Sequence, residues 1–131
     1  MPRTYLEGNA RQIERSFSPA VITTGGRQAW LAGVGRTVDE DGNELHGDFD
    51  AQVRASFRAI GGVLERCGGE LADIVTMTVF ILDVRHGDRF TAIRKEFFPE
   101  DAPASALITV KGFARPEMMV EIQAIAVLGD E

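Results

Sequence analysis

The hydrophobic pattern changes its period along the chain and so divides it into expected strands and helices. Residues 20–23 and 28–33 form two apolar runs around the turn sequence Thr-Gly-Gly-Arg, which predicts a β-hairpin. Over residues 49–67 apolar side chains recur every three or four positions, which predicts an amphipathic helix. Asp48 is placed to cap this helix, and Gly68 with Gly69 is expected to end it.

The second half of the chain predicts a strand, a helix and two further strands. Residues 74–82 are β-branched and aromatic and carry no charge, which predicts a central strand covered on both faces and ended by Asp83. A shorter helix is expected over residues 88–98, because Pro99 cannot continue it. Strands are expected over residues 106–110 and 118–128. The order ββαβαββ, which leaves out a short leading strand near Tyr5, predicts an α+β fold with both helices on one face of a mixed sheet.

The last predicted strand is apolar on both of its faces. Even-numbered residues from 118 to 128 form one apolar face, and the odd-numbered residues between them are also largely apolar. Two helices cover only one side of a sheet, so the other side would expose a large apolar patch. We therefore expect an obligate homo-oligomer in which the sheets of different copies close against one another.

Length and charge narrow the class of protein and its partners. The 131 residues suit a single domain spanning 1–131, with an N-terminal segment, residues 1–16, that we expect to be mobile. The chain has 14 basic and 20 acidic side chains and a net charge of -6, and its basic residues are scattered except for Arg3, Arg11 and Arg15. Because a phosphate backbone requires a basic stripe, nucleic acid is not an expected partner.

The sequence favours a cytoplasmic protein. Cys67 is the only cysteine, so no internal disulfide is possible and no oxidising compartment is required. The N-terminus lacks the apolar core of a signal peptide, and the longest apolar stretch, residues 74–82, is too short to span a bilayer. We expect neither secretion nor a membrane partner.

Glu121 is the most informative candidate for chemistry. It lies in the middle of an apolar strand, where an unpaired carboxylate would cost several kcal/mol. Such a group suits general acid–base catalysis or the holding of a water molecule in a cleft between subunits. The alternative is a structural ion pair or hydrogen bond that only fixes assembly, with Lys111 or Arg115 as candidate partners.

The other candidates have simpler structural explanations. Ser105 begins a strand without a Gly-x-Ser-x-Gly motif, so a backbone hydrogen bond is favoured over a nucleophile. His46 and His86 have no metal-ligand partner three or four residues away, and Cys67 belongs to the apolar stripe of the first helix. Arg94 and Arg115 could each reach a cleft and bind a carboxylate, although arginine side chains are usually solvated.

A set of short motifs runs in order through residues 18–127. Its members are Gly33, Gln52, Gly68, residues 73–75 (Asp-Ile-Val), residues 78–81 (Thr-Val-Phe-Ile), Asp83, Phe97 and Phe98, Pro103 and Ala104, and residues 120–126 (Val-Glu-Ile-Gln-Ala-Ile-Ala). In order and spacing this set resembles the Rid family, the YjgF-type reactive-intermediate deaminases, also known as endoribonuclease L-PSP proteins. The resemblance covers nearly the whole chain.

The resemblance implies a chorismate-mutase-like fold, a homotrimer with a barrel-like core, a small-molecule ligand in clefts between subunits, and no metal or organic cofactor. In deaminating members an arginine after the Pro-Ala pair binds the substrate carboxylate, and a glutamate of the last strand positions the attacking water. Glu121 matches that glutamate, whereas Ser105 stands at the arginine position. The resemblance also implies that further residues contact the ligand, namely Phe17, Ser18, Thr91, Ala106 and Leu107. Arg94 and Arg115 are additional candidates for this role.

The missing arginine leaves the function open between three classes. The first is a Rid-like hydrolase of a small imine, enamine or amide-like metabolite other than a simple 2-imino acid, with Glu121 and Ser105 as the catalytic residues. The second is a binding protein that keeps the cleft and has lost catalysis. The third, a ribonuclease or translation inhibitor, is disfavoured because an acidic protein repels RNA.

Overall fold

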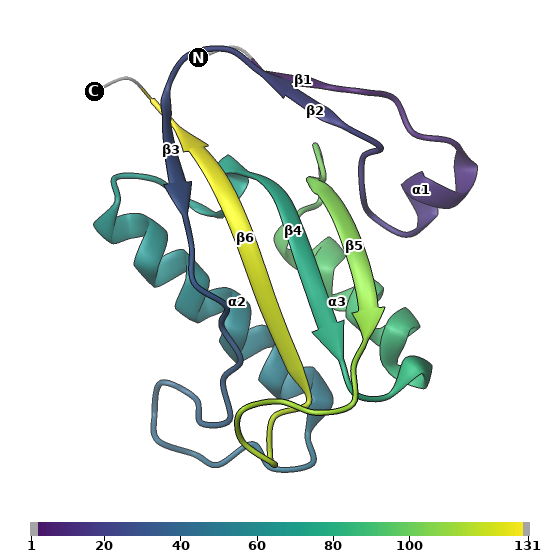
Figure 1. Ribbon diagram of the computed structural model, residues 1–131, viewed down its shortest axis with the longest axis vertical. Helices are drawn as coiled ribbons and strands as arrows, with labels where there is room; N and C mark the ends of the chain where they lie inside the picture. Colours follow the sequence, from purple (N-terminus) through teal and green to yellow (C-terminus); the bar gives the residue numbers. More distant parts are fainter. Residues whose placement is uncertain (1–2, 130–131) are drawn as a thin grey trace.

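The computed structural model describes residues 3–129 as a four-stranded sheet with helices packed on it and a separate two-stranded ribbon (Figure 1). The strands are β1 (Arg3–Tyr5), β2 (Val21–Thr23), β3 (Arg27–Trp30), β4 (Ile74–Ile81), β5 (Ala104–Thr109) and β6 (Val120–Leu128). The α-helices are α1 (Ala10–Glu14), α2 (Phe49–Arg66) and α3 (Gly87–Phe97), and two short 3₁₀ turns are η1 (Leu71–Asp73) and η2 (Val84–His86).

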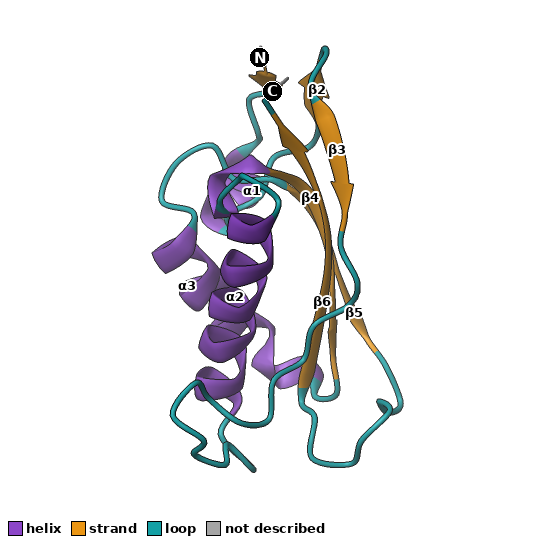
Figure 2. Cartoon of the chain, turned by 90° about the vertical axis from the view of Figure 1, so that its left-hand side faces the viewer, coloured by secondary structure: helices purple, strands orange, loops and turns teal. Residues whose placement is uncertain are grey.

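The main sheet has the strand order β3-β6-β4-β5. β4 and β5 are parallel and are joined through the crossover helix α3, whereas β3–β6 and β6–β4 are antiparallel. Turned by 90°, the molecule shows α2 and α3 together on one side of this sheet (Figure 2). The predicted α+β fold, with two helices on one face of a mixed sheet, is therefore confirmed. β5 begins two residues before its expected start, and β6 begins two residues after its expected start.

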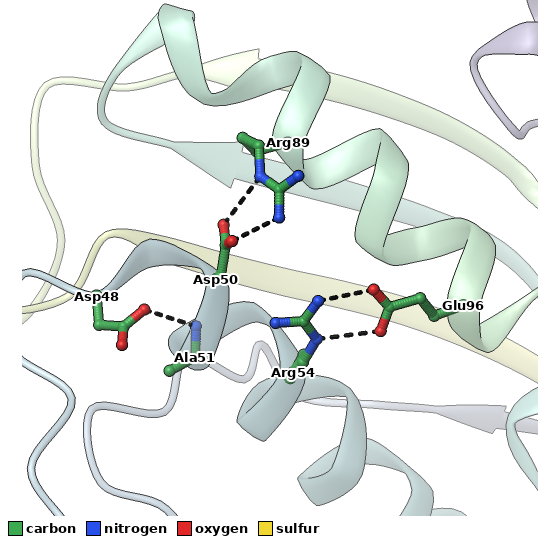
Figure 3. Close-up of polar contacts among 6 residues, drawn as sticks. All are labelled: Asp48, Asp50, Ala51, Arg54, Arg89 and Glu96. Carbon is green, nitrogen blue, oxygen red and sulfur yellow. Dashed lines mark hydrogen bonds and ion pairs between the residues drawn. The ribbon is translucent and has the colours of Figure 1, made fainter.

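The apolar stripe of α2 forms the core between the helices and the sheet. Phe57, Ile60 and Leu64 are at most 1% exposed and pack with buried side chains of α3 and of the sheet. Asp48 caps the helix, since its carboxylate accepts a 3.0 Å hydrogen bond from the Ala51 amide (Figure 3). The helix is followed by Gly68 at φ +85°, a conformation that favours glycine. The start, stripe and end of this helix were thus predictable from the sequence.

Two ion pairs join the outer surfaces of α2 and α3 (Figure 3). Arg89 of α3 lies 2.5 Å from Asp50 of α2, and Arg54 of α2 lies 2.7 Å from Glu96 of α3. In each pair the guanidinium holds the pKa of the carboxyl below its usual range. These pairs add surface contacts between α2 and α3, the helix that carries Arg94, to the buried contact of Phe57 with Phe90.

The predicted hairpin of residues 20–33 is wrong. β2 pairs with β1 to form the ribbon, whereas β3 pairs with β6 at one edge of the main sheet. Gly25 and Gly26 have φ of +74° and +82°, and they direct the chain from one sheet to the other instead of folding it back on itself. Pairing with β6 lets Ala29 pack against the core of the larger sheet, which a two-stranded hairpin lacks.

β4 is central, as predicted, but the single chain covers it on one side only. Met77, Val79 and Ile81 face the helices and are at most 1% exposed, whereas the alternate residues of the strand are half-buried. We call the uncovered side the open face. Trp30, 71% exposed, and Ile108, 43% exposed, lie on it together with Phe80, Glu121 and Ile125. This face is the apolar surface that the two-sided pattern of the last strand predicted.

The N-terminal segment contains β1 and α1 within its described residues. Asn9 and Gln12 form a reciprocal capping box at the start of α1. Arg3 ties the ribbon to the main body by hydrogen bonds to the carboxylate of Asp73 at 2.5 Å and to the carbonyl of Val127 at 2.9 Å. No helix within residues 3–129 is long and apolar enough to cross a membrane.

Candidate functional site

Glu121 lies on the open face of β6, opposite Phe80 of β4. Its carboxylate lies against Gly33: a Cβ added at that glycine would lie 3.0 Å from Glu121 Cδ and would collide with Oε2. Within residues 3–129 no hydrogen bond or ion pair joins Glu121 to Lys111 or to Arg115. The structural ion pair considered for this residue therefore does not form within one chain.

Arg115 is occupied elsewhere. Its Nη2 donates a 3.0 Å hydrogen bond to the hydroxyl of Thr37, and its Nε lies 3.6 Å from the carboxylate of Glu117. The side chain is 57% exposed, as expected for a solvated arginine. Within one chain Arg115 is therefore not among the residues that line the cavity beside Ser105.

Arg94 is buried against Ser105. The expectation that its side chain would be solvated is therefore wrong. The residue is 2% exposed, and its Nη1 donates a 2.6 Å hydrogen bond to Ser105 Oγ. Its Nη2 donates a 3.0 Å hydrogen bond to the carbonyl of Arg15, and the guanidinium carbon lies 5.1 Å from the centre of the Phe90 ring. Ser105 Oγ therefore accepts from a side chain, and a guanidinium occupies the space beside the position where the family pattern has its arginine.

A cavity of about 260 Å³ opens at this contact. It lies under the edge strand β5, between α3 and the segment that follows α1, and we call it the arginine pocket. Its lining residues are Arg11, Arg15, Phe17, Thr91, Arg94, Ser105 and Leu107. Two buried polar atoms in it, Arg94 Nε and Thr91 Oγ1, have no hydrogen-bond partner among the described residues.

The charge of Arg94 is disfavoured by its surroundings. Burial, together with a smaller effect of the nearby Arg15, lowers the pKa of this guanidinium to about 10. The group is still cationic at neutral pH, because even a pKa of about 10 lies well above 7. A buried cation without a carboxylate partner is rare in proteins, since isolated charges are costly to remove from water.

The structure thus gathers five of the expected ligand-site residues in the arginine pocket and places the others elsewhere. Ser18 lies beside the pocket and donates a 2.6 Å hydrogen bond to the carbonyl of Ala102. Ala106 is exposed and points to the open face, because neighbouring residues of a strand point to opposite sides. Glu121 also lies on that face. The five gathered residues are Phe17, Thr91, Arg94, Ser105 and Leu107.

Sequence reasoning missed Arg11 and Arg15 as pocket residues. They are four positions apart, so they project from the same side of a helix, and the Asn-x-x-Gln capping box at residues 9–12 is the signal that predicts that helix. Arg15 is also paired with Asp88 at 2.5 Å. The basic N-terminal cluster was visible in the sequence, but its target on α3 was not.

The histidines have other contacts. His46 lies 3.3 Å from the carboxylate of Glu44 in an exposed loop, and the His86 ring stacks on Phe49 at 4.3 Å. Cys67 follows α2 and packs against the core, as its place on the apolar stripe predicted. In the part of the chain that the structure describes, no group of three His, Cys, Asp or Glu side chains is arranged to hold a metal.

A mixed sheet with two helices on one face is a fold shared with solved Rid and YjgF structures. A Yersinia pestis protein of the conserved Rid family superposes with a TM-score of 0.85 at 26% identity, covering 98% of this chain and 100% of that one. A Mycobacterium tuberculosis member of the YjgF family superposes with a TM-score of 0.69 at 25% identity, covering 97% and 100%.

The sequence comparisons agree with the structural ones. The endoribonuclease L-PSP family model matches residues 8–128, and the chain therefore belongs to this family, whose members are also called Rid and YjgF proteins. The 3-aminoacrylate deaminase RutC of Acinetobacter baylyi is 31% identical over 90 residues, which are 68% of this chain and 71% of that protein. Together the family and this relative support a Rid-like hydrolase or deaminase in general terms.

Proposed function

We propose that the protein hydrolyses a small imine, enamine or amide-like metabolite in clefts between the subunits of a cytoplasmic homotrimer. Glu121 of one subunit would act as the general base for the attacking water, and Ser105 of the neighbouring subunit would contact the substrate. Family membership and the deaminase relative support this class of reaction. Nucleic acid is not part of the proposal, because the net charge of -6 disfavours it.

One observation carries the proposal: the two halves of the site lie on opposite faces of the sheet. Glu121 is on the open face, whereas Ser105 points to the helix side, where it meets Arg94. Within one chain the intervening sheet therefore separates the carboxylate from the pocket. A second copy whose open face packs against the β5 edge of the first would bring the two halves together.

The apolar open face supports such packing between copies. Trp30, at 71% exposed, is too large an apolar group to leave in water without cost, and Ile108 extends the apolar surface to the β5 edge. β5 is also an edge strand, with β4 on one side only. A homotrimer with a barrel-like core would cover both features and repeat the same cleft three times.

The chemistry needs only one carboxylate and water. Glu121 would accept a proton from water as the oxygen attacks the C=N carbon, and would then deliver that proton to the nitrogen. The resulting carbinolamine loses ammonia as its hydroxyl proton moves through the same carboxylate to the leaving nitrogen. The overall change is one C=N bond and one water converted to a carbonyl compound and ammonia, with no oxidant or reductant.

The test is hydrolysis of imines generated in situ, with and without the protein: 2-imino acids from an amino-acid oxidase, and imines that lack this carboxylate from an amine oxidase. Glu121→Gln should reduce the rate about 100-fold or more, the usual range for loss of a general base, while the trimer persists. Glu65→Gln, the same change at an exposed position of α2, is the matched control. Full activity in Glu121→Gln would remove this residue from the mechanism. Ligand binding without turnover in the native protein would favour the binding-protein alternative.

Assembly can be measured separately by light scattering on the native protein. Trp30→Glu places a charge on the open face and should convert the trimer to smaller species, because a carboxylate in an apolar interface is costly. Val84→Glu is a suitable control, since Val84 is equally exposed at 71% but lies in η2, away from the open face. A native protein that is monomeric at micromolar concentration would contradict the shared site.

A further inference from the structure

We infer that the arginine pocket binds the doubly charged end of a small ligand, either a phosphate monoester or two neighbouring carboxylates. This inference deepens the proposed function by naming the substrate class. It concerns binding alone, however, and does not require Glu121 or turnover. The proposed binding and the proposed catalytic function can therefore fail independently of each other.

The pocket contains more positive charge than the carboxylates of the chain neutralise. Three arginines line it, Arg11, Arg15 and Arg94. Asp88 pairs with Arg15, but within residues 3–129 no carboxylate pairs with Arg11 or Arg94. Two positive charges are thus left for a ligand. A single carboxylate would neutralise only one of them, whereas a phosphate monoester or a dicarboxylate would neutralise both.

The hydrogen-bond donors in the pocket point to the same class of ligand. Arg94 Nε is buried without an acceptor, although the rest of the guanidinium is bonded to Ser105 and to the carbonyl of Arg15. The buried hydroxyl of Thr91, three residues earlier on α3, also has no partner in the described chain. Oxyanions accept several such donors at once, and charge-assisted hydrogen bonds to guanidinium groups are about twice as strong as neutral ones.

The position of Arg94 indicates a preformed anion-binding site. It is held at 2% exposure between Ser105, Phe90 and the end of α1, and its charge has no partner that would explain this burial. The nearby Arg15 adds to the cost of that charge, as the lowered pKa of Arg94 reflects. A ligand anion would offset both the desolvation of the guanidinium and its repulsion from Arg15.

The size of the pocket limits the ligand. A volume of about 260 Å³ is below the usual range of pockets that enclose whole drug-sized molecules. Phe17 and Leu107 form its apolar walls, so the space suits a compact charged group with a short carbon chain. This selection also explains why a simple 2-imino acid, with one carboxylate, is not the expected preferred substrate.

The inference is tested by isothermal titration of the full-length protein with inorganic phosphate, malonate and acetate at constant ionic strength. Phosphate or malonate should bind at least about tenfold more tightly than acetate. Tighter phosphate binding assigns a phosphate monoester, and tighter malonate binding assigns a dicarboxylate. Equal or undetectable binding of all three anions would overturn the inference.

Two variants assign the binding to the pocket. Arg94→Gln should weaken the preferred dianion about tenfold or more, and Arg11→Gln, a change at an exposed residue that is expected to fold normally, should weaken it severalfold. Arg66→Gln, at the exposed end of α2, should leave the affinity unchanged. Dianion binding that is the same in Arg94→Gln, Arg11→Gln and the native protein would place it elsewhere and overturn the inference.

Discussion

Gly33 lies directly against the carboxylate of Glu121, so that a Cβ at position 33 would collide with Glu121 Oε2. Only a residue without a side chain leaves the carboxylate in its present place. Gly33 has no positive φ, and the atom it would meet is the free end of a flexible side chain. Steric contact with Glu121 is therefore the reason for glycine at this position.

We expect Gly33→Ala to displace the Glu121 carboxylate while leaving the fold intact. The rate of imine hydrolysis should fall at least about tenfold, since small displacements of a catalytic group carry large kinetic costs. The melting temperature should stay close to that of the native protein. Unchanged turnover in Gly33→Ala would show that the present position of the carboxylate is not needed.

Gly62→Ala is the matched control for that variant. Gly62 lies inside α2, and a Cβ there would meet nothing within 4 Å. Alanine is favoured over glycine in a helix interior by about 0.8 to 1 kcal/mol, so the free energy of unfolding should rise by roughly that amount. Turnover should not change. Denaturant unfolding and the hydrolysis assay measure the two effects.

Gln52 should matter for stability more than any other polar residue of α2. Its side-chain amide is fully buried, donates to the carbonyls of Leu45 and Glu117, and accepts from the Met119 amide. Gln52→Met keeps the volume but leaves these backbone groups without partners. At about 1 to 3 kcal/mol for each buried group left without a partner, a loss of at least about 3 kcal/mol is expected for the three groups.

Urea unfolding of Gln52→Met checks this value, with Glu65→Met at an exposed position of α2 as the control. The control should change the free energy of unfolding by less than about 0.5 kcal/mol. If Gln52→Met were as stable as the control, the three hydrogen bonds would contribute nothing net.

Arg94→Met should abolish dianion binding without destabilising the protein. Removing a buried, unpaired charge relieves its desolvation, and Ser105 and the Arg15 carbonyl can bond to water from the cavity instead. We expect the ligand-free variant to be as stable as the native protein or more stable by about 1 to 3 kcal/mol. Dianions that raise the melting temperature of the native protein should no longer do so. A large loss of stability in Arg94→Met would instead give Arg94 a structural role.

The sequence was sufficient for the elements that depend on local pattern. The apolar stripe from Phe49 to Leu64 with Asp48 before it predicted α2, and the two-sided last strand predicted an uncovered face. The pairing of β3 was not predictable in this way. Gly25 and Gly26 suit a hairpin turn as well as they suit a chain that leaves one sheet for another, and only the competing edge of β6 decides between them.

The candidate site was predictable where the family pattern carried it and was missed where distant segments meet. Ser105, Thr91 and Leu107 follow from their positions in the motifs, and the structure brings them together. The burial of Arg94 depends on packing between α3, β5 and the end of α1, which lies 79 residues away in the sequence at Arg15. Helical periodicity contains no signal for such a contact.

The guanidinium of Arg94 also connects three segments of the chain: α3, β5 and the end of α1. Helix α1 has no buried residue, so apolar packing hardly holds it; it is tied to α3 by the hydrogen bond from Arg94 to the Arg15 carbonyl and by the Arg15–Asp88 pair. An anion bound between Arg94 of α3 and Arg11 of α1 would add a further link between the two helices. Slower exchange of the amide hydrogens of α1 would therefore report occupancy of the pocket.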